Sequence, residues 1–404
     1  MSASADSNTY FRKGFGLKAD VEGDLSADYS GRIVDFLREN DYTLSEGGIT
    51  IRLAREFGFC YGVERAVEYA YQTRKKFPDR SLYLVGEIIH NPHVNDRLRE
   101  MGVKILERGD TGFDFSGLGA TDVVILPAFG VTIEDFAALR ELGCVLVDTT
   151  CGSVLNVWKR VEVYAREGFT ALIHGKYYHE ETRATASQVG KYPGGHYLVV
   201  RNMDEARIVC DFIEGRASRE AVRDKFAPHA VSPGFDPDKH LARIGVANQT
   251  TMLASESLAI AAEVGASIER ARGGEARARD FRSFDTICSA TQERQDAVKE
   301  LLAEPLDAMV VIGGFNSSNT ISLTALCAEH VPTYHVESPD GIDPVAGTIH
   351  HRLAGVTHHE ATTDHWLPRG EIRIGITAGA STPNSKIGEA VQRIFDSRAA
   401  AATK

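Results

Sequence analysis

The stretch Glu56-Phe57-Gly58-Phe59-Cys60-Tyr61-Gly62-Val63 decides how this chain is organised. The apolar run Ile49 to Ala54 before it predicts a short strand, and the periodic run Val63 to Phe77 after it predicts a helix. Cys60 therefore falls in a strand-to-helix turn between two glycines. Because a helix N-terminus carries partial positive charge, a thiol at this position is favoured as a thiolate.

Two further cysteines repeat this arrangement. Cys151 follows the strand-like run Val145-Leu146-Val147 and opens the helical pattern Val154 to Arg166. Cys288 follows the predicted strand Phe284-Asp285-Thr286-Ile287 and opens a helical pattern that ends near Glu304. Three such thiolates could hold three irons of a four-iron cluster and leave the fourth iron open to substrate. Three buried structural thiols are the alternative, and this is how we interpret Cys144, Cys210 and Cys327.

The composition is that of a globular protein. Of 404 residues, 43% are hydrophobic and 25% are charged, and no apolar run approaches the length of a membrane span. The net charge of −11 argues against general binding to nucleic acid or to an anionic membrane, so an anionic substrate needs local donors. Met1 to Asn8 has no apolar signal region and no arginine-rich transit segment, which predicts a cytoplasmic protein with reduced thiols.

Strands and helices alternate from Thr50 onward, which favours an α/β fold with small parallel sheets. Continuous apolar runs are typical of strands covered on both faces. They occur at Leu82–Val85, Val123–Leu126, Val145–Val147, Ala171–Ile173, Tyr197–Val200, Ile244–Ala247, Met309–Ile312 and Ile372–Ile376. The recurrence of strand, cysteine and helix predicts three similar α/β units around one centre. We expect an N-terminal extension at 1–49, units at 50–149, 150–285 and 286–398, and a tail at 399–404.

Three segments fall outside this regular pattern. In the extension, Tyr29 to Asn40 predicts one amphipathic helix with Ile33, Val34, Phe36 and Leu37 on its apolar side. We interpret the extension as a strap on the main body, or alternatively as a docking surface for a partner. We interpret the polar stretch Gly215 to Arg243 as an insertion or a lid-like loop, and Arg270 to Arg282 as a second insertion.

Ligands of open α/β sheets gather at the carboxyl ends of the strands, so the residues there are site candidates. Asn316-Ser317-Ser318-Asn319 and Thr377-Ala378-Gly379-Ala380-Ser381 are suited to binding an oxyanion through backbone N–H groups, hydroxyls and amides. Neither is a Walker A loop, which argues against nucleotide hydrolysis. His179 and Glu181 offer acid–base chemistry, with zinc as a competing hypothesis for the histidines. The run of His350, His351, His358, His359 and His365 is interpreted as an exposed loop.

Taken together, eight segments resemble the LytB family of hydroxymethylbutenyl diphosphate reductases. They occur in the family's order between Thr50 and about Phe395. They are Gly58-Phe59-Cys60-Tyr61-Gly62-Val63, Glu87-Ile88-Ile89-His90-Asn91, Asp148-Thr149-Thr150-Cys151, His179-Glu180-Glu181-Thr182, Gln249-Thr250-Thr251, Thr286-Ile287-Cys288 with Ala290 to Gln295, Asn316-Ser317-Ser318-Asn319, and Thr377-Ala378-Gly379-Ala380-Ser381.

The resemblance implies a trefoil of three α/β units around a [4Fe–4S] cluster held by Cys60, Cys151 and Cys288. It implies that the substrate hydroxyl binds the fourth iron and that two electrons and protons remove it as water. The products would be isopentenyl and dimethylallyl diphosphate, in the last step of the methylerythritol phosphate route. Glu181 would relay protons, and His179 and Thr250 would orient the substrate. The residues implied to bind the diphosphate are His90, Ser317, Ser318, Asn319 and Ser381.

This sequence also departs from the family pattern. Many bacterial members carry a second phosphate-contacting histidine where Pro127-Ala128-Phe129-Gly130 places Phe129, which cannot donate a hydrogen bond. That segment and Arg12-Lys13-Gly14-Phe15-Gly16 resemble the plant and cyanobacterial branch, which implies ferredoxin as electron donor, with flavodoxin as the alternative. Gly152 replaces the usual proline after Cys151. The resemblance leaves both a monomer and a homodimer open.

Two other functions fit the residues. One is a dehydratase or condensing enzyme resembling quinolinate synthase, whose open iron acts as a Lewis acid without consuming electrons. The other is a non-enzymatic iron–sulfur sensor, which would bind a partner and show no turnover. The two oxyanion loops and Glu181 argue against the sensor.

Overall fold

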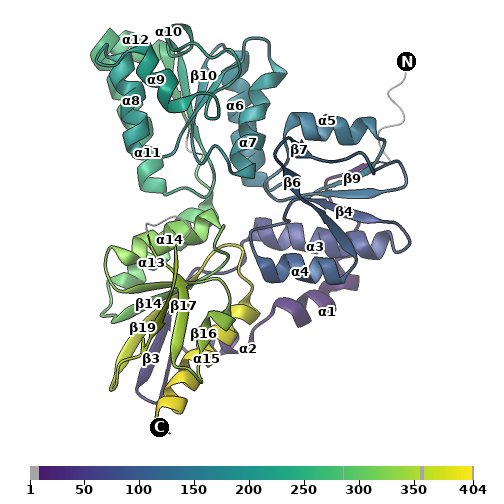
Figure 1. Ribbon diagram of the computed structural model, residues 1–404, viewed down its shortest axis with the longest axis vertical. Helices are drawn as coiled ribbons and strands as arrows, with labels where there is room; N and C mark the ends of the chain where they lie inside the picture. The colour runs from purple at the N-terminus through teal and green to yellow at the C-terminus, as the bar shows by residue number, and fades with distance from the viewer. Residues whose placement is uncertain (1–8, 285, 355–358, 403–404) are drawn as a thin grey trace. The chain divides into compact units, whose positions relative to one another are not determined.

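The computed structural model describes residues 9–284, 286–354 and 359–402 (Figure 1). The predictions made for Met1 to Asn8, Asp285 and His358 lie outside these residues. The chain divides into two compact units. The first unit contains Met1–Arg12, Arg80–Gly86 and Lys104–Cys288, and the second contains Lys13–Asp79, Glu87–Val103 and Ser289–Lys404. Each unit has its own clusters of buried apolar side chains.

The first sheet of the first unit has five short strands. In spatial order they are β1 (Tyr10–Phe11), β9 (Val145–Asp148), β8 (Val123–Leu126), β4 (Leu82–Val85) and β5 (Val103–Leu106). The pairs β1–β9, β9–β8 and β8–β4 are parallel. A small hairpin of β6 (Arg108–Gly109) and β7 (Gly112–Phe113) and the helix α5 (Ile133–Glu141) lie between the strands in sequence. Val124, Leu126, Leu139 and Leu146 form the centre of this core.

The second sheet of the first unit has four parallel strands. Their order is β11 (Tyr197–Val200), β10 (Thr170–His174), β12 (Ile244–Asn248) and β13 (Phe281–Ser283). The helices of this part are α6 (Gly152–Arg166), α7 (Glu180–Ser187), η2 (Gln188–Lys191), α8 (Met203–Ile213), α9 (Arg219–Phe226), α10 (Pro237–His240), α11 (Ala254–Arg272) and α12 (Gly274–Asp280).

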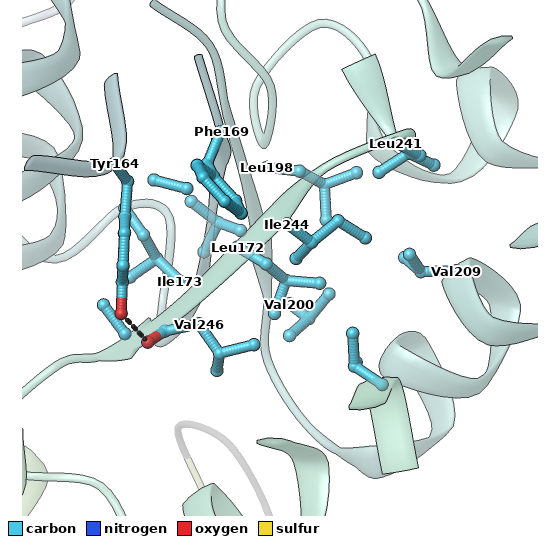
Figure 2. Close-up of a cluster of buried hydrophobic side chains, with 14 of the residues drawn as sticks. Tyr164, Phe169, Leu172, Ile173, Leu198, Val200, Val209, Leu241, Ile244 and Val246 are labelled. Atoms are coloured by element: carbon cyan, nitrogen blue, oxygen red, sulfur yellow. Dashed lines mark hydrogen bonds between the residues drawn. The ribbon is translucent and has the colours of Figure 1, made fainter. Parts of the chain in front are cut away.

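Figure 2 shows how β10, β11 and β12 present aliphatic side chains to the neighbouring helices, with Tyr164 and Phe169 at one side of the cluster. The Tyr164 hydroxyl donates to the Val246 carbonyl at 2.9 Å, which satisfies the polar end of this buried ring. The neighbouring Gly245 is required by the same ring, since a Cβ there would lie 2.5 Å from Tyr164.

The second unit is built on one mixed sheet of eight strands. Seven lie in the order β16 (Ile342–Asp343), β17 (Thr348–Arg352), β15 (Thr333–Val336), β14 (Ala308–Ile312), β19 (Ile372–Ala378), β3 (Ile49–Leu53) and β2 (Thr43–Glu46), and β18 (Glu360–Asp364) pairs with β17. The four strands β15, β14, β19 and β3 are parallel, and the strands at the margins are antiparallel. Its helices are α1 (Lys18–Tyr29), α2 (Arg32–Glu39), α3 (Tyr61–Lys76), α4 (Pro92–Glu100), α13 (Ser289–Leu302), α14 (Ser318–Ala328), η3 (Pro339–Gly341) and α15 (Asn384–Ala402).

The predicted α/β fold with small parallel sheets is confirmed. All eight apolar runs form strands within one or two residues of their predicted bounds, because strands covered on both faces have no polar positions to obscure the pattern. The helices after Cys60 and Cys151 begin two residues earlier than predicted, at Tyr61 and Gly152. The domain boundaries stay predictions, although α15 runs past the expected tail boundary at 398 to Ala402.

The N-terminal extension differs from its prediction. The helix expected from Tyr29 to Asn40 forms as α2 but begins later, at Arg32, because Tyr29 is the last residue of α1 and Ser30 is extended. The helix α1 was not predicted. Val34 and Leu37 are buried as expected, but Phe36 is 48% exposed. The segment supplies β1 to the edge of one sheet and β2 to the edge of another.

Both predicted insertions contain regular structure, so the alternative of a lid-like loop is wrong for the helical part of the first stretch. The first holds α9 and α10, with Val222 and Phe226 of α9 buried, and the second holds α12 and β13. Two apolar side chains are enough to bury a helix of eight residues but too few to produce a periodic signal. The strand expected at Phe284 to Ile287 lies earlier, because Phe281 pairs in register with Ile244.

The histidine-rich stretch is a β-hairpin of β17 and β18, so the expectation of an exposed loop is wrong for its strands. His351 is buried, whereas His350 is exposed and lies 3.0 Å from a Glu360 carboxylate oxygen. Alternation of inward and outward residues along β17 explains why neighbouring histidines differ. Cys144, Cys210 and Cys327 are buried packing residues, as predicted.

Candidate active site

Three of the six cysteines lie at the starts of helices. Cys60 and Cys151 are the N-cap residues of α3 and α6, and Cys288 immediately precedes α13. Among the described residues no cysteine forms a disulfide, but these three thiols are half-buried, whereas those of Cys144, Cys210 and Cys327 are buried. A metal or cluster can reach a half-buried thiol and not a thiol packed inside a core. The exposure of the six cysteines therefore fits the three predicted ligands and sets them apart from the packing residues.

A buried carboxylate holds the turn that carries Cys151. Asp148, which ends β9, is 5% exposed, and its Oδ1 accepts from the N–H and the hydroxyl of Thr150 at 2.9 and 2.5 Å. Its Oδ2 accepts from the Tyr10 hydroxyl at 2.5 Å, and Arg12 Nε lies 3.4 Å from the same oxygen. Charge-assisted hydrogen bonds of this kind are about twice as strong as neutral ones. The turn is therefore fixed before any ligand binds to Cys151.

The environment of Cys151 favours the protonated thiol. Burial raises the pKa of Cys151 above its ordinary value, and the neighbouring Cys288 raises it further, whereas the N–H groups of Ser153 and Val154 lower it. The N–H groups at the helix start thus lower the pKa of Cys151 less than burial raises it. Cys288 in turn lies close to α6, with its Sγ 3.3 Å from Ser153 Oγ. A metal that binds Cys151 must displace its proton.

Glu181 is a buried carboxylate at the start of α7. It is 1% exposed, and Thr250 donates its N–H to Oε1 at 2.6 Å and its hydroxyl to Oε2 at 3.0 Å. His179 is the N-cap residue of α7, and its Nδ1 accepts the Glu181 N–H at 3.1 Å. A ring nitrogen that accepts carries no proton, so the proton of the neutral imidazole lies on Nε2. The three residues thus offer a fixed carboxylate and a fixed imidazole donor.

The Gln249 side chain links the loops that carry these residues. Its Oε1 accepts from the Lys176 N–H at 3.1 Å and from the Thr182 hydroxyl of α7 at 3.0 Å. Its Nε2 donates to Thr251 Oγ1 at 2.7 Å. Because Gln249 and Thr250 are adjacent in sequence, the position of Thr250 relative to α7 is set by this amide.

Phe129 packs against His179 in place of the histidine that many bacterial members carry. The two rings meet edge to face, with centroids 5.6 Å apart and planes at 82°. Gly130, at a φ of +76°, makes the turn possible, and a Cβ there would lie 2.4 Å from the Trp158 ring. Phe129 therefore supports the orientation of His179 but adds no hydrogen-bond donor.

In the second unit, the turn that carries Cys60 pairs with the loop after β19. The Cys60 N–H donates to the Ala380 carbonyl at 3.2 Å, and the Gly58 N–H donates to the Ala378 carbonyl at 3.3 Å. Gly58 has a φ of +67°, and a Cβ at this position would lie 3.0 Å from the Thr382 carbonyl. Glycine is therefore required here by both backbone conformation and space.

The loop before α14 has an unsatisfied buried donor. Ser317 is the N-cap residue of α14, and the buried Asn319 accepts the Ala380 N–H on its Oδ1 at 2.9 Å. Among the described residues, Asn319 Nδ2 has no hydrogen-bond partner. A buried amide N–H without a partner is costly. An oxyanion at the N-terminus of α14 would satisfy it, which fits the predicted phosphate contact.

Ser381 and His90 lie beside this loop. The Ser381 hydroxyl donates to the His90 carbonyl at 3.1 Å, and His90 Nδ1 lies 2.7 Å from a Glu87 carboxylate oxygen. The same oxygen accepts from Asn316 Nδ2 at 3.1 Å. The backbone of Gly314 also packs closely, since a Cβ there would lie 2.5 Å from the His90 carbonyl oxygen. These contacts hold the two predicted oxyanion loops and His90 in one cluster.

The structure thus groups the predicted residues in two sets. The first unit brings together His179, Glu181 and Thr250, and separately Cys151 and Cys288. The second unit brings together Cys60, His90, Ser317, Ser318, Asn319 and Ser381. The sequence analysis gave no role to Asp148, although an aspartate after a strand and before two threonines is a typical turn signal.

These features define an α/β protein with half-buried thiols at helix starts, a buried acid–base pair and serine- and asparagine-bearing oxyanion loops. Sequence comparison narrows this class. The family described as LytB protein matches residues 51–395, and the chain belongs to the LytB family.

Curated relatives cover almost the whole chain. Proteins named 4-hydroxy-3-methylbut-2-enyl diphosphate reductase from Gloeobacter violaceus and Thermosynechococcus vestitus are each 47% identical to it, over 96% and 98% of the chain and 93% and 96% of their own lengths. A Synechococcus relative of the same name is 48% identical over 96% of both chains.

Two solved structures are also similar. One, described as (E)-4-hydroxy-3-methyl-but-2-enyl diphosphate reductase, the terminal enzyme of the non-mevalonate pathway, is 28% identical, with a TM-score of 0.52 over 85% of this chain and 98% of its own. The other, a reductase from Plasmodium falciparum, is 20% identical with a TM-score of 0.62 over 85% of this chain and 86% of its own, and supports the fold alone. None of the described helices is both long and apolar enough to span a membrane.

Proposed function

We propose that this chain is a 4-hydroxy-3-methylbut-2-enyl diphosphate reductase that forms isopentenyl and dimethylallyl diphosphate. Full-length relatives of about equal size carry this name. The observation in the structure that best supports the proposal is the Glu181 carboxylate. It is buried, fixed by two hydrogen bonds from Thr250, and next to the imidazole of His179, which is suited to controlled proton delivery.

Cys60, Cys151 and Cys288 would hold the [4Fe–4S] cluster of this enzyme. Their thiols are half-buried and form no disulfide within the described part of the chain, and thiolates are the preferred ligands of iron–sulfur groups. When bound, a cluster with one open iron supplies electrons and Lewis acidity to the allylic C–O bond. With three cysteines as ligands, the chain leaves the fourth position for substrate.

Residues of the first unit would manage the protons. Replacement of the allylic C–O bond by a C–H bond uses two electrons and two protons: one proton leaves with the hydroxyl as water, and the other is added to a carbon of the allyl group. Glu181 would deliver the proton to the leaving oxygen. Thr250 would keep the carboxylate in place, and His179 would donate its Nε2–H to the substrate. All three residues are buried, which limits the contact of these groups with bulk water.

Residues of the second unit would bind the diphosphate. Asn319 Nδ2 is a buried donor that has no hydrogen-bond partner among the residues that the structure describes, and Ser317, Ser318, Ser381 and His90 lie in or beside the same loops. Pre-organised donors of this kind hold a phosphate without the cost of reordering the loop. Phe129 supplies no such donor, so the remaining contacts would carry the diphosphate.

A ferredoxin, or alternatively a flavodoxin, would deliver the electrons one at a time, and the reaction would take place in the cytoplasm. The electron demand separates this proposal from the two alternatives. A dehydratase would turn over without consuming electrons, and a sensor would not turn over.

The test is anaerobic reconstitution of the full chain with iron and sulfide, followed by reaction with 4-hydroxy-3-methylbut-2-enyl diphosphate and reduced ferredoxin. We expect both five-carbon diphosphates and two electrons consumed per product molecule. Water loss without electron consumption would identify a dehydratase. A reconstituted protein that binds the substrate but releases no product would contradict the proposal.

The variant Glu181→Gln separates the proton role from folding. We expect unchanged iron content and a kcat about 100- to 10,000-fold lower, the usual contribution of a general acid. Glu256→Gln is the matched control, because Glu256 also lies in the first unit but is partly exposed, accepts the Met203 N–H at 3.1 Å and lies 3.8 Å from His174 Nε2. Wild-type turnover by Glu181→Gln would remove Glu181 from the mechanism.

A further inference from the structure

A buried arginine donates hydrogen bonds to the turn that carries Cys60. Arg294 of α13 is 3% exposed, and its guanidinium donates to backbone carbonyls only. Nη2 lies 2.7 Å from the Gly58 carbonyl oxygen and 3.2 Å from that of Phe59, and Nε lies 3.2 Å from the Gly58 oxygen. Nη1 donates to the Ala290 carbonyl within α13 at 2.8 Å.

In the described part of the chain, the charge of this arginine has no carboxylate partner. Among the described residues, no aspartate or glutamate oxygen forms an ion pair with Arg294, whereas Arg97 of the same unit pairs with Asp28 at 2.9 Å. Burying an unpaired ion costs several kcal/mol, on the order of the stability of a domain. Carbonyl dipoles offset part of this cost, but the net positive charge remains, so an anion nearby would be stabilised.

The anion that this position suits is the group bound by Cys60. The peptide between Phe59 and Cys60 is held at both ends, since its carbonyl accepts from Arg294 and its N–H donates to the Ala380 carbonyl. Arg294 also lies on the helix that starts directly after Cys288. The guanidinium is thus one peptide unit from one predicted ligand and two helical turns from another.

We propose that Arg294 is a positioning residue that fixes the Cys60 turn and whose permanent positive charge favours the reduced form of the bound cluster. This inference rests on the proposed function. A [4Fe–4S]²⁺ core with three thiolates has a net charge of −1, and one electron from ferredoxin changes it to −2. A fixed cation stabilises the more negative state and raises the reduction potential of the cluster.

The test compares Arg294→Gln, Arg294→Lys and the control Arg74→Gln in the reconstituted protein. Arg74 also donates to backbone carbonyls, those of Phe77 and Pro78, but at the far end of α3 from Cys60. The reduction potential is measured by titration with dithionite and redox mediators, and iron is counted in each sample. We expect a more negative potential in Arg294→Gln, by roughly tenfold in the ratio of reduced to oxidised protein, about 59 mV for one electron.

The lysine variant separates charge from position. Arg294→Lys keeps the charge and loses the planar fork, so we expect its potential to lie nearer to wild type than that of Arg294→Gln. Equal shifts in both variants would overturn the charge role, and unchanged potentials in both would overturn the whole inference. If wild type itself binds no iron, the proposed function fails instead.

The positioning role is measured in the metal-free protein. Hydrogen exchange of the Cys60 and Gly58 amides reports the hydrogen bonds to Ala380 and Ala378, whether or not a cluster is bound. We expect faster exchange of these two amides in Arg294→Gln than in wild type and no change in Arg74→Gln. Wild-type protection in Arg294→Gln would contradict the positioning role.

Discussion

The turns that carry Cys60 and Cys151 share one local design and differ in what supports them. Each follows a parallel strand, and each cysteine caps the helix that follows. The Cys151 turn is held by the buried anion of Asp148, which accepts from Thr150 and Tyr10. The Cys60 turn is held by the buried cation of Arg294, which donates to carbonyls.

The two turns therefore have opposite electrostatic surroundings, although both have the same backbone role of leading from a strand into a helix that begins after a cysteine. A carboxylate beside the Cys151 turn makes added negative charge less favourable there, whereas a guanidinium beside the Cys60 turn makes it more favourable. Asp148 is itself compensated by Arg12 and Tyr10. Asp148 and Arg294 can therefore be substituted one at a time.

The largest effect is expected from the ligands themselves. Cys60→Ser and Cys151→Ser should each abolish stable cluster assembly, because a serine hydroxyl replaces a soft thiolate. Iron content and the broad visible absorbance of the reconstituted protein measure this loss. Cys144→Ala, which removes a buried packing thiol, is the control and should retain its iron. Full iron in either serine variant would refute that ligand assignment.

The next effect is expected from the anionic support. Asp148→Asn removes the charge that accepts from Tyr10 and Thr150 while keeping the size of the side chain, and should lower the free energy of unfolding by about 2–3 kcal/mol. Denaturant titration of the metal-free protein measures it. Asp211→Asn, which replaces an exposed carboxylate paired with Arg216, should change stability by less than about 1 kcal/mol. If both substitutions lower the free energy of unfolding equally, Asp148 does not stabilise the protein more than an exposed carboxylate does.

A smaller effect is expected from the other end of the same hydrogen bond. Tyr10→Phe removes one donor to Asp148 and keeps the ring that packs against Phe136. It should therefore lower the free energy of unfolding by about 1–2 kcal/mol. Burial and Asp148 raise the pKa of Tyr10, so the hydroxyl stays a donor at neutral pH. When Asp148 is already replaced by Asn, Tyr10→Phe should lower the free energy of unfolding by less than it does in wild type. If the stability losses of the two single variants simply add in the double variant, the two residues do not share an interaction.

The smallest effect at neutral pH concerns the histidines buried near the site loops of each unit. Burial lowers the pKa of His174 in the first unit and of His335 in the second to about 4. His335 Nε2 donates to the Gly313 carbonyl at 2.9 Å, just before the oxyanion loop. The unfolded chain binds these protons below its ordinary pKa of about 6.5 and the folded chain only below about 4, so stability is full above pH 6.5 and falls as the pH drops towards 4.

Urea titrations at pH 7 and pH 5 measure this loss. His335→Gln keeps a donor for Gly313 and cannot be protonated, so its stability should fall less between the two pH values than that of wild type, by up to about 1.4 kcal/mol for each pH unit. His350→Gln, at an exposed position, should behave as wild type does. The same pH dependence in all three proteins would show that His335 is not responsible.

The parts that were predictable from the sequence share a physical cause. Strands such as Val123–Leu126 and Ile244–Asn248 are apolar at almost every position, because both faces are covered, and they were found directly. The cysteine turns were found because glycine and a helix start mark them. The predictions were wrong or missing where the hydrophobic pattern of the sequence is weak or absent, as in α1 and α9 and at the strand before Cys288.

The sequence by itself determined the alternation of strands and helices, the three helix-capping cysteines and the family, because these depend on residues that are neighbours in the chain. Tertiary structure alone decided which side chains hold the turns that carry the cysteines. Tyr10 lies 138 residues from Asp148, and Arg294 lies 236 residues from Gly58, so no local pattern could pair them. The reason is that a buried charge must find its partners wherever the fold places them, and sequence distance does not limit that choice.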